Sequence, residues 1–204
     1  DGNTQNPRIV KVTEDKTYTA YFAKSTYTIT KHYNTQHGSI SGSTSGKYLD
    51  VISLTAIPNT GYHFSQWHDG VTDNPRSFVL TQDTTFAAFF AVNHYQLNIS
   101  TNNPDAGTVS GAGTYEYGTY TEISATANYG YHFSHWNDYN YDNPRQVQVT
   151  EDKTYTATFD KNTYAISLSC NEEQGSVEGV TSAEYLDTVT ISATPNFGYH
   201  FVQW

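Results

Sequence analysis

The sequence repeats itself about every 68 residues, and this periodicity limits the fold to a tandem array of small units. The peptide Gly-Tyr-His-Phe-x-x-Trp occurs at intervals of 69 and 68 residues, ending at Trp67, Trp136 and Trp204. The peptide Asn-Pro-Arg follows the same spacing, beginning at Asn6, Asn74 and Asn143. A unit of this length lies near the lower size limit for an independent hydrophobic core, so neighbouring units are expected to stabilise one another.

Each unit has the composition and the pattern of a small all-β module. Aromatic residues make up 15% of the chain, 18 residues are tyrosine, and methionine is absent. Aromatic and β-branched residues favour strands, and no window shows the periodicity of an amphipathic helix. The last two strands of a unit are predicted to form a hairpin that turns at Gln82-Asp83 in the first unit. Alternation and turn residues predict five or six short antiparallel strands in that unit, at 27–30, 38–42, 51–56, 61–67, 77–81 and 85–89.

The units divide the chain into two complete repeats and two parts. Residues 27–94 and 95–163 correspond to complete units. Residues 1–26 carry the last two strands of a unit, and residues 164–204 carry the first four strands of another. Because part units would leave core faces and strand edges open, we expect the ends to be completed by a longer polypeptide or by another copy. Linkers of only a few residues predict semi-rigid joints.

The aromatic peptide is predicted to be the core strand of each unit. Tyr62 and Phe64 share one face of a strand, whereas Trp67 has the opposite parity. Either both faces are covered, or a β-bulge turns the tryptophan inwards. Each unit has little Leu, Ile or Val, so its core must be built from aromatic residues. The predicted core positions are Tyr62, Phe64, Trp67, Tyr131, Phe133, Trp136, Tyr199, Phe201 and Trp204.

Composition and charge argue against several classes of function. The net charge is −10, with 10 Lys plus Arg against 20 Asp plus Glu, so nucleic acid and anionic membrane surfaces are poor partners. No apolar run approaches the roughly 20 residues that cross a bilayer, so membrane insertion of this segment is not expected. The one cysteine, Cys170, excludes an intrachain disulfide and is expected to pack in a strand. Catalytic signatures are missing, which predicts a non-catalytic chain without a cofactor.

Histidines and acidic loops are the candidate metal ligands. His63, His132 and His200 occupy one position in three units, which favours packing or a hydrogen-bonded edge position over a zinc site. Oxygen ligands for calcium are available in the loop after each tryptophan, but Asp and Asn are also typical of turns, and we expect turn chemistry there. The arginine of each Asn-Pro-Arg peptide is expected to stack on an aromatic ring or to pair with a loop carboxylate. The calcium candidates are Asp69, Asp73, Asn74, Asp138, Asp142 and Asn143.

Tyrosines outside the recurring peptides are the candidate ligand-binding residues. Tyr115, Tyr117, Tyr120, Tyr139 and Tyr141 cluster in the second unit, and the four candidates are Tyr115, Tyr117, Tyr139 and Tyr141. The faces of Tyr and Trp rings can stack on the apolar faces of pyranose rings, so such residues can bind sugars. The clustering therefore predicts contact either with a neighbouring unit or with a ligand.

Together, these motifs resemble the divergent internalin-type B-repeat, also known as the Listeria–Bacteroides repeat. The resemblance rests on Gly61–Trp67, Gly130–Trp136 and the closing strand Thr154–Phe159, and the chain departs from it at Tyr139, where the first unit has Gly70. It implies β-grasp-like or small sandwich modules of a secreted or surface-attached bacterial protein, and it transfers no catalytic residues. We expect a stalk, fibre or adhesin spacer whose partners are neighbouring repeats or copies of the chain arranged end to end. The alternative is an adhesive module that binds carbohydrate or a host or cell-surface protein through its surface tyrosines.

Overall fold

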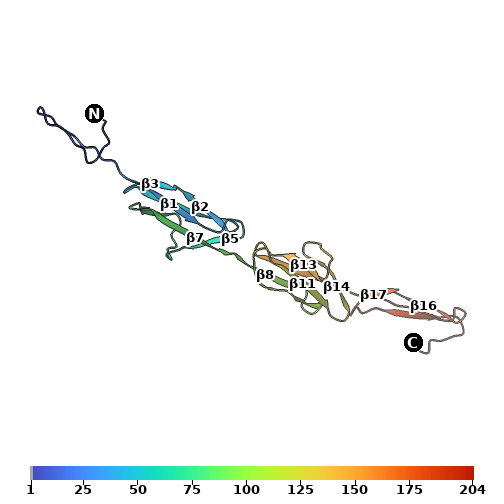
Figure 1. The fold of residues 1–204 in the computed structure, drawn as a ribbon. Coiled ribbons are helices and arrows are strands. Elements are labelled where there is room, and N and C mark those ends of the chain that lie inside the picture. The colour runs from blue at the N-terminus through green and yellow to red at the C-terminus, as the bar shows by residue number, and fades with distance from the viewer. Residues whose placement is uncertain (1) are drawn as a thin grey trace.

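The structure is a computed structural model that describes residues 2–204. Figure 1 shows the repeats in single file from the N-terminus to the C-terminus. All regular secondary structure in this part of the chain is β-strand, which confirms the all-β tandem architecture expected from the sequence. No helix long and apolar enough to span a membrane occurs among these residues.

The two complete repeats share one architecture of seven strands in two sheets. In the first repeat the sheets have the orders β3-β1-β7-β5 and β2-β4-β6, and in the second β10-β8-β14-β12 and β13-β11-β9. The strands of the first repeat are β1 (Thr26–His32), β2 (Gly38–Gly42), β3 (Ser45–Lys47), β4 (Val51–Pro58), β5 (Tyr62–Trp67), β6 (Arg76–Val79) and β7 (Thr84–Val92). Those of the second are β8 (His94–Thr101), β9 (Gly107–Ser110), β10 (Gly113–Glu116), β11 (Tyr120–Ala127), β12 (Tyr131–Trp136), β13 (Arg145–Gln148) and β14 (Lys153–Lys161).

The opening and closing strands of each repeat pair in parallel, which the sequence-based expectation of purely antiparallel strands missed. Ile29 of β1 lies opposite Thr84 of β7, and Leu97 of β8 lies opposite Lys153 of β14. A parallel pair needs a long crossover, and here the rest of the repeat supplies it. Because the chain leaves a repeat in the direction in which it entered, the next repeat can follow directly.

The predicted hairpin at Gln82-Asp83 is wrong, because the chain changes sheets at that point. Strand β6 pairs with β4, whereas β7 pairs with β1 and β5. The Asp83 carboxylate accepts hydrogen bonds from the backbone N–H of Thr28 (2.7 Å) and from its hydroxyl (2.9 Å). Asp152 accepts the corresponding bond from the N–H of Gln96. The acidic residue thus ties the crossover to the opening strand.

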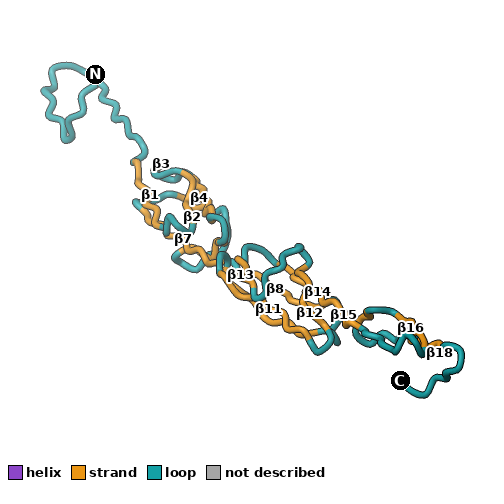
Figure 2. The backbone as a smooth tube through the Cα atoms, turned by 90° about the vertical axis from the view of Figure 1, so that its right-hand side faces the viewer, coloured by secondary structure: helices purple, strands orange, loops and turns teal. Residues whose placement is uncertain are grey.

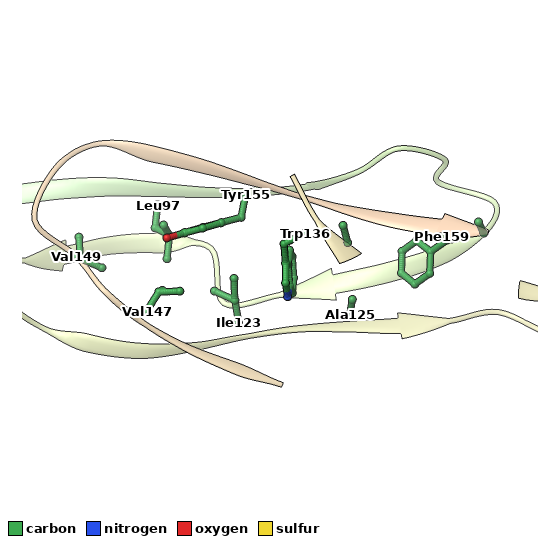
Figure 3. Packing of buried hydrophobic residues seen from close by; sticks show 10 residues of the cluster. Leu97, Ile123, Ala125, Trp136, Val147, Val149, Tyr155 and Phe159 are labelled. Carbon is green, nitrogen blue, oxygen red and sulfur yellow. The ribbon is translucent and has the colours of Figure 1, made fainter. Parts of the chain in front are cut away.

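Each repeat has its own core around one tryptophan. Trp67 and Trp136 are both completely buried. The pairing of β5 with β7 shifts register between Phe64 and Gln66, and that of β12 with β14 shifts between Phe133 and His135. This bulge changes the parity of the strand and turns the indole inwards, which is one of the two arrangements expected from the sequence. Figure 3 shows Trp136 among the buried side chains Leu97, Ile123, Ala125, Val147, Val149, Tyr155 and Phe159.

The remaining predicted core residues differ between the repeats. Phe64 packs against the first core, and Tyr131 and Phe133 pack against the second. Tyr62 is half-buried and stacks on His37 with ring centroids 4.4 Å apart. Phe64, Tyr131 and Phe133 are therefore part of the cores as predicted, whereas Tyr62 lies outside the first core.

The two terminal segments lack the sheets of a complete repeat. Residues 2–25 contain no strand, as Figure 2 shows at the N-terminal end, so the prediction of two strands in this segment is wrong. In the C-terminal part, the predicted core residues Tyr199, Phe201 and Trp204 are exposed, because no closing strand covers them. Cys170 is also exposed and lies outside the strands, contrary to expectation. The C-terminal strands are β15 (Thr163–Ala165), β16 (Gly175–Gly179), β17 (Ser182–Glu184) and β18 (Ile191–Pro195), which pair β15 with β17 and β16 with β18.

Candidate functional site

In the first repeat, the loop between Trp67 and Arg76 is held against the core by a hydrogen bond, an ion pair and a cation–π contact. The indole Nε1–H of Trp67 donates a hydrogen bond to the carbonyl oxygen of Asp73 at 2.9 Å. The guanidinium of Arg76 pairs with the Asp69 carboxylate at 2.6 Å and lies over the ring of Phe86, 4.8 Å from its centroid. The arginine therefore does both things expected from the sequence, stacking and pairing, and it holds the loop against the core.

The second repeat forms the same contacts with its own residues. The indole of Trp136 donates to the carbonyl oxygen of Asp142 at 2.9 Å. Arg145 pairs with Asp138 at 2.8 Å and lies 5.0 Å from the ring centroid of Tyr155. Recurrence at two independent places in one chain identifies this loop as part of the fold.

The asparagine of the Asn-Pro-Arg peptide completes the loop by binding one strand residue twice. The Asn74 side chain accepts a hydrogen bond from the N–H of Ala56 and donates one to its carbonyl oxygen, both at 2.8 Å. Asn143 forms the same pair with Ala125, at 2.9 and 2.6 Å. The amide thus satisfies both backbone groups of one residue in the middle strand of the smaller sheet.

The ion pairs lower the pKa of both loop aspartates. The hydrogen bond from Arg76 is the largest cause for Asp69 and lowers its pKa to about 2. For Asp138, burial alone would raise the pKa, but the hydrogen bond and the charge of Arg145 outweigh it and lower the pKa. Both carboxylates therefore lose their charge at a lower pH than an ordinary aspartate, and both already have a cationic partner.

The calcium candidates are engaged in the fold. Asp69 and Asp138 bind arginines, and the amides of Asn74 and Asn143 bind strand backbone. Asp73 and Asp142 supply carbonyl oxygens to the tryptophans. Among residues 2–204, no group of three or more His, Cys, Asp and Glu side chains is arranged to hold a metal ion. The loop geometry is that of a structural turn.

The recurring histidine lies at the joint between repeats. His63 Nδ1 lies 2.8 Å from the Oδ1 atom of Asn93, the one residue between β7 and β8. The backbone N–H of Asn93 donates to the carbonyl oxygen of Gly61, and its own carbonyl accepts from the N–H of Tyr117, both at 2.8 Å. One linker residue is thus bonded to the repeat before it and to the repeat after it.

The next joint repeats these bonds. His132 Nδ1 lies 2.9 Å from Asn162 Oδ1, and the N–H of Asn162 donates to Gly130. Tyr185 replaces Tyr117 and donates its N–H to the Asn162 carbonyl. The ring of each tyrosine lies so close to the glycine of the preceding repeat that a Cβ atom there would collide with it. His63 and His132 are in the hydrogen-bonded edge position that their sequence spacing favoured. Within residues 2–204, His200 has no equivalent side-chain hydrogen bond.

A family model described as the divergent InlB B-repeat domain matches residues 27–94, 97–163 and 166–204. The chain belongs to the divergent InlB B-repeat family. The resemblance inferred from the recurring peptides is therefore confirmed. A search of curated proteins found no match.

Two of the four candidate tyrosines serve the B-repeat fold. Tyr115 is half-buried against the second core, and its hydroxyl donates to the carbonyl of Gly111 at 3.0 Å. Tyr117 covers Gly61 at the joint, so contact with a neighbouring unit explains its place in the cluster. The same position carries Tyr48 in the first repeat and Tyr185 in the third segment. Alignment of the repeats beyond their main peptides would have identified Tyr117 as a repeat position.

The other two tyrosines are exposed on the loop of the second B-repeat. The side chains of Tyr139 and Tyr141 are 73% and 70% exposed. The Tyr139 ring stacks on His135 with a centroid distance of 5.3 Å and an interplanar angle of 5°, and Tyr141 is tilted by 48° at 6.0 Å from His135. Sequence reasoning identified both tyrosines and missed the contribution of His135 to their packing.

Tyr139 has a backbone conformation that glycine normally adopts. Its φ is 59°, and the equivalent Gly70 of the first B-repeat has a φ of 82°. A side chain in this left-handed region costs roughly 1–2 kcal/mol. The core does not explain why this position is tyrosine, because the first B-repeat forms its core with glycine at the equivalent position.

Proposed function

We propose that this chain is a non-catalytic spacer segment of a secreted or surface-attached bacterial protein. The family supports the coarser statement that it is a surface-protein repeat module. The observation that carries the spacer function is the joint, which has the same bonds at Asn93 and at Asn162. A chain that places successive units identically sets a fixed rise per unit, as in other repeat arrays.

The joint contacts oppose bending between repeats. A flexible linker separates domains by several free residues, whereas β7 and β8 are separated only by Asn93. Both backbone groups of Asn93 are bonded, one to each repeat, and its side chain meets His63. Tilting one repeat relative to the next would break these bonds and lift the Tyr117 ring from Gly61. Several such joints in succession would keep the array of repeats extended and fix its direction.

The charge of the chain suits an extended spacer. A net charge of −10 makes neighbouring segments repel one another, which limits collapse and nonspecific association. The partners in this role are the neighbouring repeats, or copies of the chain end to end. The spacer role does not account for the exposed rings of the second repeat.

A pair of glycine variants tests the joint. Gly61 and Gly70 have φ values of 84° and 82°, so alanine at either position strains the backbone to the same degree. Only Gly61 has the Tyr117 ring against it, whereas a Cβ at Gly70 has no atom within 4 Å. We expect Gly61→Ala to broaden the distribution of distances between the repeats and Gly70→Ala to leave it unchanged.

The measurement is electron-spin distance spectroscopy between labels on equivalent strands. Cysteines replace the exposed Ser77 of β6 and Gln146 of β13, and Cys170→Ser removes the exposed native thiol. The unsubstituted joint should give one narrow distance peak. A distribution as broad as that of a flexible linker would rule out the spacer function. An equal effect of the two glycine variants would show that Tyr117 does not hold the joint.

A further inference from the structure

We propose that the rings of His135, Tyr139 and Tyr141 form a binding site for neutral carbohydrate, with a pyranose ring stacked on Tyr139. These three residues are called the aromatic platform. The proposal goes beyond the spacer function, because a spacer needs no ligand. It is independent of the joint contacts, since none of the three residues takes part in them.

The aromatic platform is a local addition to a fold that does not require it. The two B-repeats have the same strand order, buried tryptophan, arginine pair and asparagine bridge. At the three platform positions, however, the first repeat has Gln66, Gly70 and Thr72. The left-handed backbone at Tyr139 makes its tyrosine a costly replacement for glycine. Strain of this kind is found where a side chain serves binding.

The platform is preorganised for a flat apolar ligand face. Tyr139 and His135 are nearly parallel, so the histidine supports one side of the tyrosine ring and fixes its orientation. The half-buried His135 is itself held by Ser134, whose Oγ lies 3.0 Å from its Nδ1. A side chain ordered before binding loses little conformational entropy on binding. Tyr141, tilted against the same histidine, adds a second exposed aromatic surface.

The polar groups around the platform suit sugar hydroxyls. Within residues 2–204, no protein partner engages the hydroxyls of Tyr139 and Tyr141, the Nε2 atom of His135 or the side-chain NH₂ of Asn140. They offer donors and acceptors at the edge of an aromatic surface, the combination found in sites for small polar ligands. The C–H groups of a pyranose face carry partial positive charge and complement the negative face of a tyrosine ring.

The surrounding charge favours a neutral sugar over an acidic one. The nearby cation, Arg145, is neutralised by Asp138. The carboxylate of Asp142 adds negative charge to the same loop. A uronic or sialic acid would therefore be repelled. Single-stranded nucleic acid also stacks on aromatic rings, but it requires a cationic groove, and this loop has no unpaired cation.

The size of the platform also favours a sugar over a folded protein. A stable protein interface buries about 800 Å² on each partner, with 20–30 residues a side. The platform has three side chains on one loop and the adjoining strand end. One or two pyranose rings match this extent.

The test is calorimetric and NMR titration of the full chain with neutral tetrasaccharides of glucose, mannose and galactose, and with tetragalacturonic acid as the anionic comparison. We expect one or more neutral sugars to bind and to shift the resonances of the platform residues. Tyr139→Gly should weaken binding by about tenfold or more, as removal of a stacking aromatic does elsewhere. This variant restores the residue of the first repeat, so it is expected to fold.

Two further variants separate stacking from other effects. Tyr139→Phe keeps the ring and should retain binding within about threefold, because only one hydroxyl is lost. Tyr120→Ala removes an exposed tyrosine of the same repeat outside the platform and should leave binding unchanged. Failure of all neutral sugars to bind at about 10 mM, well above the Kd of even weak specific complexes, would overturn the proposal. So would binding that persists in Tyr139→Gly, or a preference for the anionic sugar.

A protein ligand would give a different result. If the chain attaches to cells through Tyr139 and enzymatic removal of their glycans leaves attachment unchanged, the platform recognises protein and the carbohydrate proposal is overturned. Loss of attachment on glycan removal supports it. Because Tyr139→Gly leaves the joint intact, its distance distribution between labels should not change. The platform and the spacer function can therefore fail separately.

Discussion

The two complete repeats share the contacts around the buried tryptophan and at the joint, and they differ on the exposed loop that follows the tryptophan. Trp67 and Trp136 are equally buried, and each indole donates to a carbonyl of the following loop at 2.9 Å. The loops diverge where Gly70 is replaced by Tyr139. Contacts that recur in both repeats are those required to fold and to join the units. The platform occurs in one repeat only, so it must be explained by something other than the fold.

The C-terminal segment shows what the recurring aromatic peptide cannot do alone. Phe201 and Trp204 keep a ring contact at 5.6 Å, close to the 5.4 Å between Phe133 and Trp136. Yet Trp204 is 60% exposed, whereas Trp136 is buried. In the second repeat, β12 pairs with the closing strand β14, and this segment has no equivalent of that strand among its residues. The peptide supplies the core residue, and the closing strand buries it.

The largest predicted effect separates these two tryptophans. Trp136→Ala removes a completely buried indole together with its hydrogen bond to Asp142. We expect a loss of about 3–5 kcal/mol in the free energy of unfolding of the second repeat, because the cavity cannot collapse fully. In a module of this size, such a loss approaches the whole stability. Urea unfolding followed by the amide NMR signals of the second repeat measures it.

Trp204→Ala is the matched control. The exposed indole should cost less than about 0.5 kcal/mol, as surface substitutions generally do. Equal losses for the two variants would mean that the C-terminal segment forms a closed core in solution.

Local patterns in the sequence predicted the parts of the fold that depend on neighbouring residues. Alternation located the main strands, and the parity of Trp67 against Phe64 required a bulge or two covered faces. The place of Arg76 after Pro75 at the start of a strand indicated stacking or pairing, and the structure shows both. Each inference needs only residues close together in the chain, where side-chain direction follows from backbone periodicity.

The features that were missed depend on distant pairing. The parallel register of Ile29 with Thr84 joins the two ends of a repeat, and no local pattern encodes it. The bridge from Asn74 to Ala56 spans 18 residues and resembles an ordinary turn asparagine in the sequence. The short strand β3 has the composition of a loop, because Ser and Gly have low strand propensity. Its pairing with β1 alone defines it.

The second prediction tests whether the asparagine bridge is equivalent in the two repeats. Asn74→Ala leaves the N–H and the carbonyl of Ala56 without the partner they have in the folded state. We expect a loss of about 1–3 kcal/mol, the cost of unsatisfied buried backbone groups. Asn143→Ala should destabilise the second repeat by a similar amount. Thermal unfolding of each variant, resolved by repeat through NMR, provides the comparison.

Aspartate substitution distinguishes the two bonds of the bridge. Asn74→Asp keeps an acceptor for the N–H of Ala56 but cannot donate to its carbonyl while ionised. The stability of Asn74→Asp should therefore be no higher than that of Asn74→Ala at neutral pH. It should rise in acid, because a protonated carboxyl group can donate to the carbonyl of Ala56. A stability that instead rises with pH would contradict the two hydrogen bonds assigned to Asn74.

The third prediction exchanges the residues that distinguish the loops. Tyr139→Gly should raise the stability of the second repeat by up to about 1 kcal/mol, because it relieves the left-handed strain. Part of this gain is offset by the greater freedom of glycine in the unfolded chain. Gly70→Ala should lower the stability of the first repeat by about 1 kcal/mol for the same reason. A stability loss in Tyr139→Gly would show that its ring serves the fold, and calorimetry detects either sign.

The smallest predicted effect is the acid response of the two loop aspartates. A pKa lowered to about 2 in the folded state, against 3.8 in the unfolded chain, means that Asp69 stabilises the first repeat above pH 3.8. This contribution is lost as the pH falls from about 4 to 2, because the unfolded state binds its proton first. Asp69 is more than one third exposed, so solvent screening limits the contribution to less than about 1 kcal/mol.

Asp69→Asn should therefore flatten the stability of the first repeat over this pH range and leave that of the second unchanged. Asp138→Asn should flatten the stability of the second repeat over this pH range and leave that of the first unchanged. The change should be smaller than for Asp69→Asn, because burial opposes the effect of Arg145 on the pKa of Asp138. Urea midpoints resolved by repeat between about pH 5 and pH 2 measure both, and carboxyl NMR titration reports the pKa values directly. A steeper acid loss in the second repeat than in the first would mean that Arg145 binds its aspartate more strongly than Arg76 does, despite the longer ion-pair distance of 2.8 Å against 2.6 Å.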